Sequence, residues 1–352
     1  MSDFIGTKLT MNLGERSYDI IVKRGSLENL YQFARLDRRV AVVTDSGVPA
    51  QYAQMVADQC KDATIITVPQ GEASKSFKIL ETVLRQMLDF GMGRGDLVVA
   101  VGGGVVGDLA GFAASIYMRG IDFINCPTTT LSMIDSSIGG KTAVDLGDTK
   151  NIVGAFWQPK LVIVDPDTLS TLPRRHFING LAEAIKAGLL ADPELFSIFE
   201  KEDVDDRIGD IICRSLRFKK SIVEQDETEQ GMRKALNFGH TIGHAFELAG
   251  HYETWTHGQG VAAGMNWAAQ LGVGLGITPP EVVEQIRSIL NKFGLPQDIP
   301  CPWETMTEAV GLDKKRTGDS ITLILLERLG QAVPRRMKKD QLLELLEPMC
   351  GR

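Results

Sequence analysis

The sequence contains few cysteines and no cysteine pair of the C-x-x-C type. The cysteines are odd in number and scattered: Cys60, Cys126, Cys213, Cys301 and Cys350. This pattern argues against a disulfide framework and against a zinc site made of thiolates. It is typical of a protein in a reducing compartment, and we therefore expect a cytoplasmic location.

Long apolar runs and an excess of positive charge are also absent. The longest apolar stretch, residues 97–118, is interrupted by clustered glycines and by Asp108, which favours a strand, a turn and a helix over a membrane span. The N-terminus lacks the basic-then-apolar layout of a signal peptide. A net charge of -7 argues against nucleic acid as the main partner, although it is compatible with a local site for a small anion. We expect neither a membrane nor a nucleic-acid partner.

The first half of the chain has the pattern of a parallel sheet. Residues 7–23 alternate as in a β-hairpin, and short apolar runs then alternate with helical stretches. The predicted strands are 39–44, 63–68, 97–101, 122–126 and 161–164. Buried strands separated by helices indicate βαβ units.

The second half is mainly helical in pattern. Predicted helices cover 175–201, 205–228, 233–250, 258–276 and 279–293, followed by a late strand at 320–326 and a terminal helix at 338–347. With 352 residues the chain exceeds the usual single-domain size of about 100–200 residues. We therefore predict an α/β plus α fold, with an α/β domain at 1–172 and a helical domain at 173–352.

A glycine-rich motif follows the predicted strand at 97–101. Gly102, Gly104 and Gly107 form G-x-G-x-x-G between a strand and a helix, where backbone N–H groups and the helix N-terminus can hold a pyrophosphate. The motif also fits a tight turn that packs a helix on a sheet, and it does not follow the first strand as is common. Asp45, at the end of an earlier strand, could accept hydrogen bonds from ribose hydroxyls. Together these features favour nucleotide binding.

A second polar region lies between residues 127 and 151. It combines small hydroxylic residues, paired glycines, Lys141 and the Lys150–Asn151 pair. These groups suit an anionic, oxygen-rich ligand. The alternative is a solvated loop with ordinary surface lysines.

Four of the five histidines lie between residues 240 and 257. Arg233, Asn237, His240 and His244 are spaced by four, three and four residues, so one continuous helix would align them on one face. Apolar residues surround this stripe, and two neighbouring glycines would permit close approach of another element. The pattern predicts the lining of a polar cavity.

A carboxylate on an earlier helix could complete a metal site. Glu183 and Lys186 lie three residues apart among apolar neighbours. Glu183 with two imidazoles would make a three-ligand zinc site with an open position. The spacing does not decide which histidines take part, although His240 and His244 are the first choice. H-x-x-x-H lacks the Glu of the zinc-protease motif, and Glu183–Lys186 could also be a helix-surface ion pair.

Four segments together resemble the 3-dehydroquinate synthase family of the sugar phosphate cyclase superfamily. They are residues 102–112, 135–142, 150–156 and 236–244, and the resemblance extends from about residue 40 to residue 326. It implies an N-terminal Rossmann-like NAD domain and a C-terminal helical domain that binds zinc, for which cobalt can substitute. It also implies a homodimer in which Arg119 enters the active site of the neighbouring subunit.

The resemblance assigns roles residue by residue. The implied metal ligands are Glu183, His240 and His257, which moves His244 to the substrate. The implied NAD contacts are Asp45, Glu72, Lys75, Gly103, Gly104, Asp108, Thr128, Thr129, Lys150 and Thr171. The implied substrate contacts are Asp135, Lys141, Asn151, Lys186, Lys219, Arg233, Asn237, His244 and one lysine of the pair Lys314–Lys315.

The implied substrate is a phosphorylated sugar acid, 3-deoxy-D-arabino-heptulosonate 7-phosphate. It would become 3-dehydroquinate and phosphate in the shikimate pathway, through transient oxidation by NAD, phosphate elimination, re-reduction and aldol closure. Other sugar phosphate cyclases, a glycerol-dehydrogenase-like oxidoreductase and a non-catalytic NAD-binding regulator are the alternatives. No implied ligand or substrate residue is missing, which favours the synthase.

One residue departs from the family pattern. The family usually has Glu two residues after the last ligand histidine, whereas this chain has Gln259. If position 259 supports the metal from the outer shell, the loss of charge would weaken metal binding. The alternative is that Gln259 only caps or packs the following helix.

Overall fold

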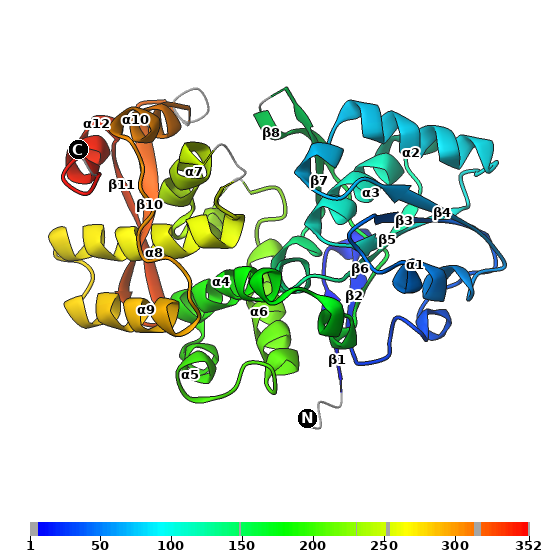
Figure 1. Ribbon diagram of the computed structural model, residues 1–352, viewed down its shortest axis with the longest axis horizontal. Coiled ribbons are helices and arrows are strands. Elements are labelled where there is room, and N and C mark those ends of the chain that lie inside the picture. Colours follow the sequence, from blue (N-terminus) through cyan, green and yellow to red (C-terminus); the bar gives the residue numbers. More distant parts are fainter. Residues whose placement is uncertain (1–5, 148, 230, 251–253, 313–317, 351–352) are drawn as a thin grey trace. The chain divides into compact units, whose positions relative to one another are not determined.

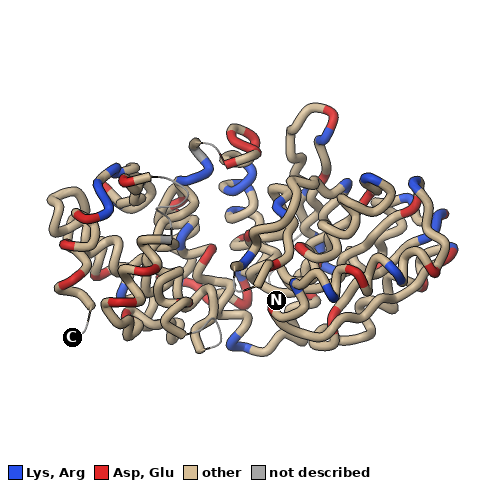
Figure 2. Tube along the Cα trace, turned by 90° about the horizontal axis from the view of Figure 1, so that it is seen from above, with Lys and Arg blue, Asp and Glu red and all other residues tan. Residues whose placement is uncertain are grey.

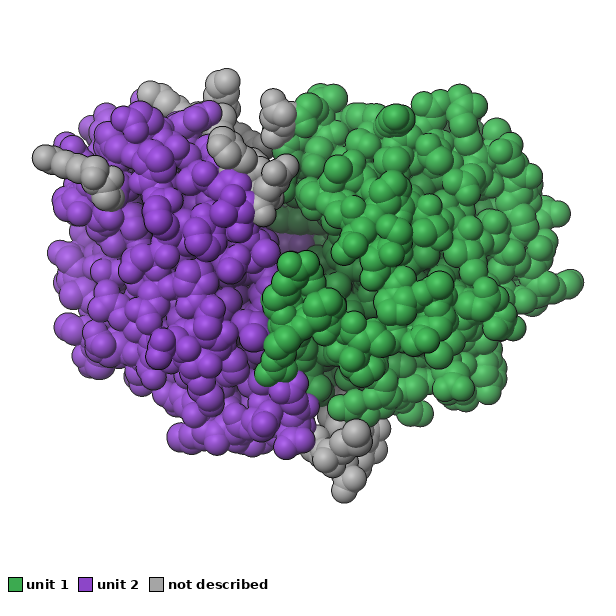
Figure 3. Space-filling model, viewed as in Figure 1, with its two compact units in different colours: residues 1–177, 208–228 green, residues 178–207, 229–352 purple. Residues whose placement is uncertain are grey.

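The computed structural model describes residues 6–147, 149–229, 231–250, 254–312 and 318–350. The chain divides into two compact units, residues 1–177 with 208–228 and residues 178–207 with 229–352 (Figure 3). A single boundary at 172 does not describe this division, because the chain changes unit after Phe177, Arg207 and Thr228. In both units basic and acidic residues are interspersed along the chain (Figure 2). None of the helices in the described ranges is long and apolar enough to cross a membrane.

The first unit is built on a seven-stranded sheet with strand order β1-β2-β9-β6-β5-β3-β4. The strands are β1 (Thr7–Met11), β2 (Tyr18–Val22), β3 (Arg39–Asp45), β4 (Asp62–Val68), β5 (Leu97–Gly102), β6 (Asp122–Pro127) and β9 (Leu161–Val164). β1 and β2 form the predicted antiparallel hairpin, and all other neighbours pair in parallel. The predicted Rossmann-like sheet is confirmed.

Helices cover both faces of this sheet (Figure 1). They are α1 (Ala50–Ala57), α2 (Phe77–Asp89) and α3 (Gly104–Ile116). Val40 and Val42 of β3 pack in a core cluster with α1, whereas Ala41 and Val43 pack in a second cluster with α2 and α3. Because successive strand residues point to opposite faces, a sheet covered on both sides requires the continuous apolar runs seen in the sequence.

Two further elements complete the first unit. The antiparallel hairpin β7 (Lys141–Leu146) and β8 (Thr149–Phe156) packs on α3. It was not predicted, because the paired glycines before it and its lysines and hydroxyl groups resemble a ligand loop. The helix α6 (Ile208–Val223) packs on β1, β2 and the π-helical turn η5 (Ser132–Ser136), although the sequence analysis placed it in the second domain.

The second unit is mainly helical. It contains most of α4 (Arg174–Ala191), together with α5 (Pro193–Lys201), α7 (His240–Ala249), α8 (His257–Gly274), α9 (Pro280–Lys292), α10 (Trp303–Leu312), α12 (Lys339–Leu346) and the hairpin β10 (Ser320–Arg328) and β11 (Gln331–Lys338). The predicted helix 175–201 is two helices, because Asp192 accepts a hydrogen bond from the Leu195 N–H and starts α5 with a proline in its first turn.

The continuous helix predicted for 233–250 is wrong. Residues 232–237 form the 3-10 helix η7 (Met232–Asn237), and α7 begins only at His240. Between them Gly239 adopts a left-handed conformation with φ of 78°, which interrupts the helical path. Arg233 and Asn237 therefore do not share a helix face with His240 and His244.

Candidate active site

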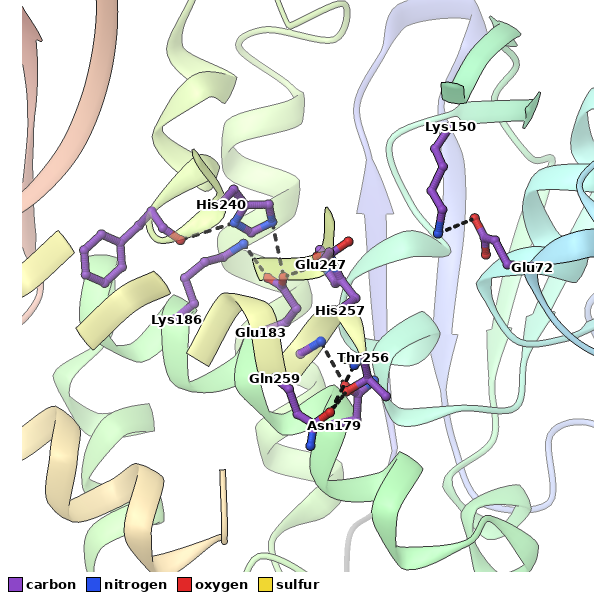
Figure 4. A network of polar contacts seen from close by, with 12 residues as sticks. Glu72, Lys150, Asn179, Glu183, Lys186, His240, Glu247, Thr256, His257 and Gln259 are labelled. Atoms are coloured by element: carbon purple, nitrogen blue, oxygen red, sulfur yellow. Dashed lines mark hydrogen bonds and ion pairs between the residues drawn. The ribbon is translucent and has the colours of Figure 1, made fainter. Parts of the chain in front are cut away.

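Three potential metal ligands meet inside the second unit (Figure 4). Glu183 of α4, His240 at the start of α7 and His257 at the start of α8 each offer one ligand atom, and these atoms all lie within 4.8 Å of one another. Nε2 of His257 lies 3.2 Å from Oε1 of Glu183, and Nε2 of His240 lies 3.4 Å from the same oxygen. This is the set implied by the family resemblance. His244, the alternative from spacing, is not part of it.

Lys186 fixes the charge of Glu183. It forms an ion pair with Oε2 of the carboxylate, one helical turn away, and both side chains are almost completely buried. A helix-surface ion pair is therefore excluded. Burial raises the pKa of Glu183, but the opposing effects of Lys186 and His240 are larger, so the net pKa is well below its usual value. Glu183 is thus an ionised carboxylate with Oε1 directed at the two imidazoles.

The two imidazoles are oriented through their other nitrogens. Nδ1 of His240 lies 3.2 Å from the carbonyl oxygen of Phe238, and Nδ1 of His257 lies 2.9 Å from Oε1 of Glu247. Burial and Lys186 lower the pKa of His240. Burial also lowers the pKa of His257, but hydrogen bonds to Glu183 and Glu247 outweigh it and raise the pKa to about 10. One carboxylate and two imidazoles suit Zn²⁺ or Co²⁺.

Glycines bring α7 and α8 close enough for these contacts. A Cβ on Gly264 would lie 2.1 Å from the Gly239 carbonyl oxygen, and one on Gly243 would lie 2.9 Å from the Gly260 carbonyl oxygen. The predicted close approach at Gly239 and Gly243 is therefore confirmed. Sequence reasoning missed Glu247, although it lies on α7 three residues after His244.

The other predicted residues of the second unit differ in exposure. Arg233 is buried, whereas Asn237 and His244 are exposed. The His244 ring lies edge-on to His240, with 5.8 Å between the ring centroids. Lys314 and Lys315 lie outside the described residues, as does His251.

The glycine motif forms a close turn in the first unit. Gly103 caps α3, directly after β5. A Cβ on Gly102 would lie 2.6 Å from the Val106 side chain, and one on Gly104 would lie 3.0 Å from Oγ of Ser136. Asp45 ends the neighbouring strand, and its Oδ1 accepts hydrogen bonds from the N–H groups of residues 47 and 48. The N-terminus of α3 and Asp45 thus lie at the ends of two neighbouring parallel strands, β5 and β3, at the same edge of the sheet.

The motif lies at the switch point of the sheet. From β3 the chain proceeds outward to β4 and then returns to the other side of β3 with β5, and ligands of such sheets bind at the carboxyl ends of the strands where the order reverses. Near these ends, four buried hydroxyls have no hydrogen-bond partner in the described part of the chain: Thr44, Thr130, Ser136 and Ser137. Of these, Ser136 is shown to lie next to the glycine turn, with its Oγ 3.0 Å from where a Cβ on Gly104 would be.

Three predicted segments converge on a buried lysine. Lys75 is 4% exposed, and its Nζ donates to Oδ2 of Asp108 at 2.7 Å and to Oδ1 of Asn151. Oε1 of Glu72 lies 3.7 Å from Lys75 Nζ. The same oxygen lies 3.8 Å from Lys150 Nζ (Figure 4). Burial lowers the pKa of Lys75, but Asp108 and Glu72 outweigh burial, and the pKa is raised. Burial raises the pKa of Asp108, and the ion pair with Lys75 opposes that rise. Lys75 is therefore held as a cation.

Asn151 is held in a left-handed conformation with φ of 53°. Its backbone N–H donates to Oδ1 of Asp145 at 2.7 Å, and the N–H of Asp145 donates to the Lys75 carbonyl oxygen at 2.7 Å. Asp145 thus connects the β7–β8 hairpin to the loop that carries Lys75. Sequence reasoning missed it, because it lies in a hairpin that was not predicted.

The remaining predicted residues of the first unit have local contacts. Nζ of Lys219 donates to the backbone carbonyl and to the carboxylate of Asp135, at 2.8 and 2.9 Å. The backbone N–H of Thr128 donates to the carbonyl oxygen of Gly102. The hydroxyl of Thr129 shares a hydrogen bond with that of Ser132, and the hydroxyl of Thr171 shares one with that of Tyr52. Lys141 is exposed at the start of β7. Arg119 is exposed at the end of η4 (Tyr117–Arg119), with φ of 71°.

Family models and curated relatives both identify the 3-dehydroquinate synthase family. The model of the 3-dehydroquinate synthase N-terminal region matches residues 65–179, and that of the C-terminal region matches residues 180–316. The 3-dehydroquinate synthase of Thermodesulfovibrio yellowstonii is 41% identical over 341 residues, covering 92% of this chain and 94% of the relative. That of Streptococcus mutans is 41% identical over 354 residues, covering 97% and 99%.

Solved structures of sugar phosphate cyclases are similar over nearly the whole chain. A 2-deoxy-scyllo-inosose synthase, complexed with carbaglucose-6-phosphate, NAD+ and Co2+, has a TM-score of 0.87 and 27% identity, covering 97% of this chain and 100% of that one. A 2-epi-5-epi-valiolone synthase from Streptomyces hygroscopicus, with NAD+ and Zn2+ bound, has a TM-score of 0.84 and 28% identity, covering 96% and 99%. Glycerol dehydrogenase from Schizosaccharomyces pombe, at 15% identity and a TM-score of 0.60, shares the fold.

Proposed function

The chain belongs to the 3-dehydroquinate synthase family, and from this premise we infer that it converts 3-deoxy-D-arabino-heptulosonate 7-phosphate to 3-dehydroquinate and phosphate. This lyase reaction belongs to the shikimate pathway of aromatic amino acid biosynthesis. The observation that carries the inference is the convergence of Glu183, His240 and His257, in a chain that matches relatives of that name over nearly its full length.

We propose that NAD binds at the carboxyl ends of β3 and β5, where the glycine turn begins α3 and the strand order reverses. The other cofactor residues named from the sequence keep that proposed role. Zinc or cobalt would be held by Glu183, His240 and His257. Similar cyclases contain NAD with Co²⁺ or Zn²⁺, which supports both assignments. When bound, NAD supplies a hydride acceptor that is restored within each turnover, and the metal supplies a Lewis acid.

Residues of the second unit would bind the substrate and move its protons. Lys186 keeps Glu183 ionised through their ion pair. Arg233 and Asn237 can hold a carboxylate or phosphate, because guanidinium and amide groups donate several hydrogen bonds. The exposed imidazole of His244 is the proposed proton donor and acceptor for the substrate.

Residues of the first unit would hold anionic groups of the substrate. Lys219 is fixed by two contacts to Asp135, so little side-chain freedom is left to lose on binding. Lys141 and Asn151 come from the β7–β8 hairpin, where Asp145 fixes the backbone of Asn151. The proposed roles are charge complementarity from the lysines and hydrogen bonding from Asn151.

We also propose a homodimer in which Arg119 completes the partner's site. Arg119 adjoins a hollow lined by apolar residues of α2 and α3 and by Tyr117 and Met118, with Glu81 and Arg85 also in its lining. Ile116 and Met118 are two residues apart and are 43% and 40% exposed. Neighbouring exposed apolar side chains are typical of an interaction surface. A second copy of the chain would cover them and receive the arginine. The unpaired cysteines, all five of them free thiols, support a cytoplasmic location.

The function is tested by phosphate release from 3-deoxy-D-arabino-heptulosonate 7-phosphate, with catalytic NAD and zinc. Sedoheptulose 7-phosphate serves as the comparison substrate. The proposal requires phosphate and 3-dehydroquinate from the first substrate without net NADH. Turnover of sedoheptulose 7-phosphate alone would identify a different cyclase, and net NADH would identify a dehydrogenase.

A further inference from the structure

Glu247 is a buried carboxylate with no role in the assignments above. It lies on α7, is 8% exposed, and its Oε1 lies 2.9 Å from Nδ1 of His257 (Figure 4). It faces the nitrogen opposite to the one that approaches Glu183. His257 is thus held between two carboxylates, one at each ring nitrogen.

The packing of α7 on α8 places this carboxylate. A Cβ on Gly260 would lie 3.1 Å from Cγ of Glu247 and 2.9 Å from the Gly243 carbonyl oxygen. The glycine therefore leaves just enough room for the Glu247 side chain to lie along α8 and reach His257, one turn earlier. The start of α8 is held from the other side, because the Gly258 N–H donates to Oδ1 of Asn179 at 2.9 Å.

The two ligand histidines differ in their outer partners. His240 faces a neutral backbone carbonyl, that of Phe238, whereas His257 faces the carboxylate of Glu247. A carboxylate that accepts the Nδ1 proton fixes the ring orientation, leaves Nε2 as the ligand atom and makes that nitrogen a stronger donor. Gln259 does not have this function, because its side-chain oxygen caps α8 at Thr256.

We propose that Glu247 is a positioning residue that directs Nε2 of His257 to the metal and strengthens its binding. The inference rests on the proposed metal site. The negative charge that supports His257 from outside the metal site thus comes from Glu247 on α7, in a chain that lacks the family's usual Glu at position 259. Glu247 would therefore act through His257 and would not contact the metal, NAD or substrate.

The test compares full-length variants by competition titration with Zn²⁺. Glu247→Gln keeps the side-chain shape and an acceptor but removes the charge, whereas Glu247→Ala removes both. Glu284→Gln, on an α9 side chain that is 74% exposed, is the matched control. We expect zinc affinity to fall by about 10-fold for Glu247→Gln and by about 100-fold for Glu247→Ala, the range typical of lost outer-shell partners. The control should bind like the unmodified protein.

A second measurement separates positioning from loss of fold. The visible absorption of bound Co²⁺ reports ligand geometry, and we expect it to change in both Glu247 variants while far-UV circular dichroism does not. If Glu247→Ala does not fold, the Gln variant decides. Unmodified zinc affinity and an unmodified Co²⁺ spectrum in Glu247→Gln would overturn the proposal. Zinc titration measures metal affinity without any turnover. A protein that fails the synthase assay but shows the expected loss of zinc affinity in the Glu247 variants would therefore reject the proposed function and keep the role of Glu247.

Discussion

Oε1 of Gln259 accepts hydrogen bonds from the backbone N–H and the hydroxyl of Thr256, at 3.0 and 2.9 Å. The two residues form a capping box at the first turn of α8. The family's usual Glu would occupy the same cap. Residue 259 thus caps α8. The carboxylate next to Nδ1 of His257 is that of Glu247.

Gln259→Glu should stabilise the protein and leave metal binding unchanged. A negative charge in the first turn of a helix interacts favourably with the helix dipole, by about 0.3–1 kcal/mol. Denaturant unfolding of both forms measures the gain, and zinc competition at matched pH measures metal affinity. Tighter zinc binding in the Glu form would show that position 259 supports the metal after all.

Chelation should abolish turnover, and zinc or cobalt should restore it. An open three-ligand site exchanges its metal with chelators. His257→Ala should lose tight zinc binding while remaining folded, because the side chain lies at the start of α8 and outside the apolar core. Metal analysis, circular dichroism and phosphate release test these expectations together. Full turnover by metal-free protein would contradict the site assignment.

Zinc binding should release about one proton at pH 7, because a metal can bind Nε2 of an imidazole only after its proton leaves. In the metal-free protein the pKa of His257 is about 10, so this residue is protonated at neutral pH. Apparent zinc affinity should therefore rise with pH until about 10. Calorimetry in two buffers of different ionisation enthalpy counts the protons, and a buffer-independent heat would contradict the prediction.

The same raised pKa affects the stability of the metal-free protein. Because the folded-state pKa of His257 lies above the value in the unfolded chain, its contribution is fully present below the ordinary imidazole pKa of 6.5. It is lost as pH rises through about 10. Chemical denaturation of metal-free protein at a series of pH values measures this loss, and His257→Ala should remove that part of the pH dependence.

Asp145→Ala should weaken NAD binding by about fivefold, which corresponds to one hydrogen bond of about 1 kcal/mol. The reason is that Asp145 fixes Asn151, whose side-chain oxygen accepts a hydrogen bond from Lys75, one of the proposed NAD contacts. Asp145→Asn keeps an acceptor and should bind NAD almost normally. Calorimetric titration with NAD compares the three proteins, and equal affinity in all of them would show that Asn151 keeps its place unaided.

Arg119→Ala and Lys141→Ala should complement each other in mixed dimers. If Arg119 acts on the partner's site and Lys141 on its own, one of two sites in each mixed dimer is intact. After complete exchange about one quarter of the original activity should return, because half of the dimers are mixed. Exchange is followed with differently tagged subunits. Proven exchange without recovery would place Arg119 outside the partner's site.

The sheet and most helices could be predicted because their sequence signals are local. The runs at 39–44 and 97–101 are apolar throughout, as strands buried on both faces must be. The β7–β8 hairpin could not be predicted, because polar and apolar residues mix along its strands and several side chains of β8 face solvent. The division of 233–250 depends on Gly239, whose left-handed conformation is imposed by close packing on α8.

The metal group was predictable only in part. Spacing indicated that Glu183 and two of the clustered histidines would meet, but it could not select His257 over His244, because this choice depends on how α7 and α8 cross. The resemblance supplied that choice, and the structure brings the three residues together. Glu247 has no signal of its own, since a carboxylate on a helix is usually exposed.

The order in which the chain is made has a consequence for the first unit. Its sheet is complete by residue 164, but α6, which packs on β1 and β2, is synthesised after a stretch that belongs to the second unit. Lys219 therefore reaches Asp135 only when the ribosome has passed residue 223. Truncation at residue 177 would leave the surface beneath α6 exposed, and co-translational folding of this unit cannot finish before part of the next has emerged.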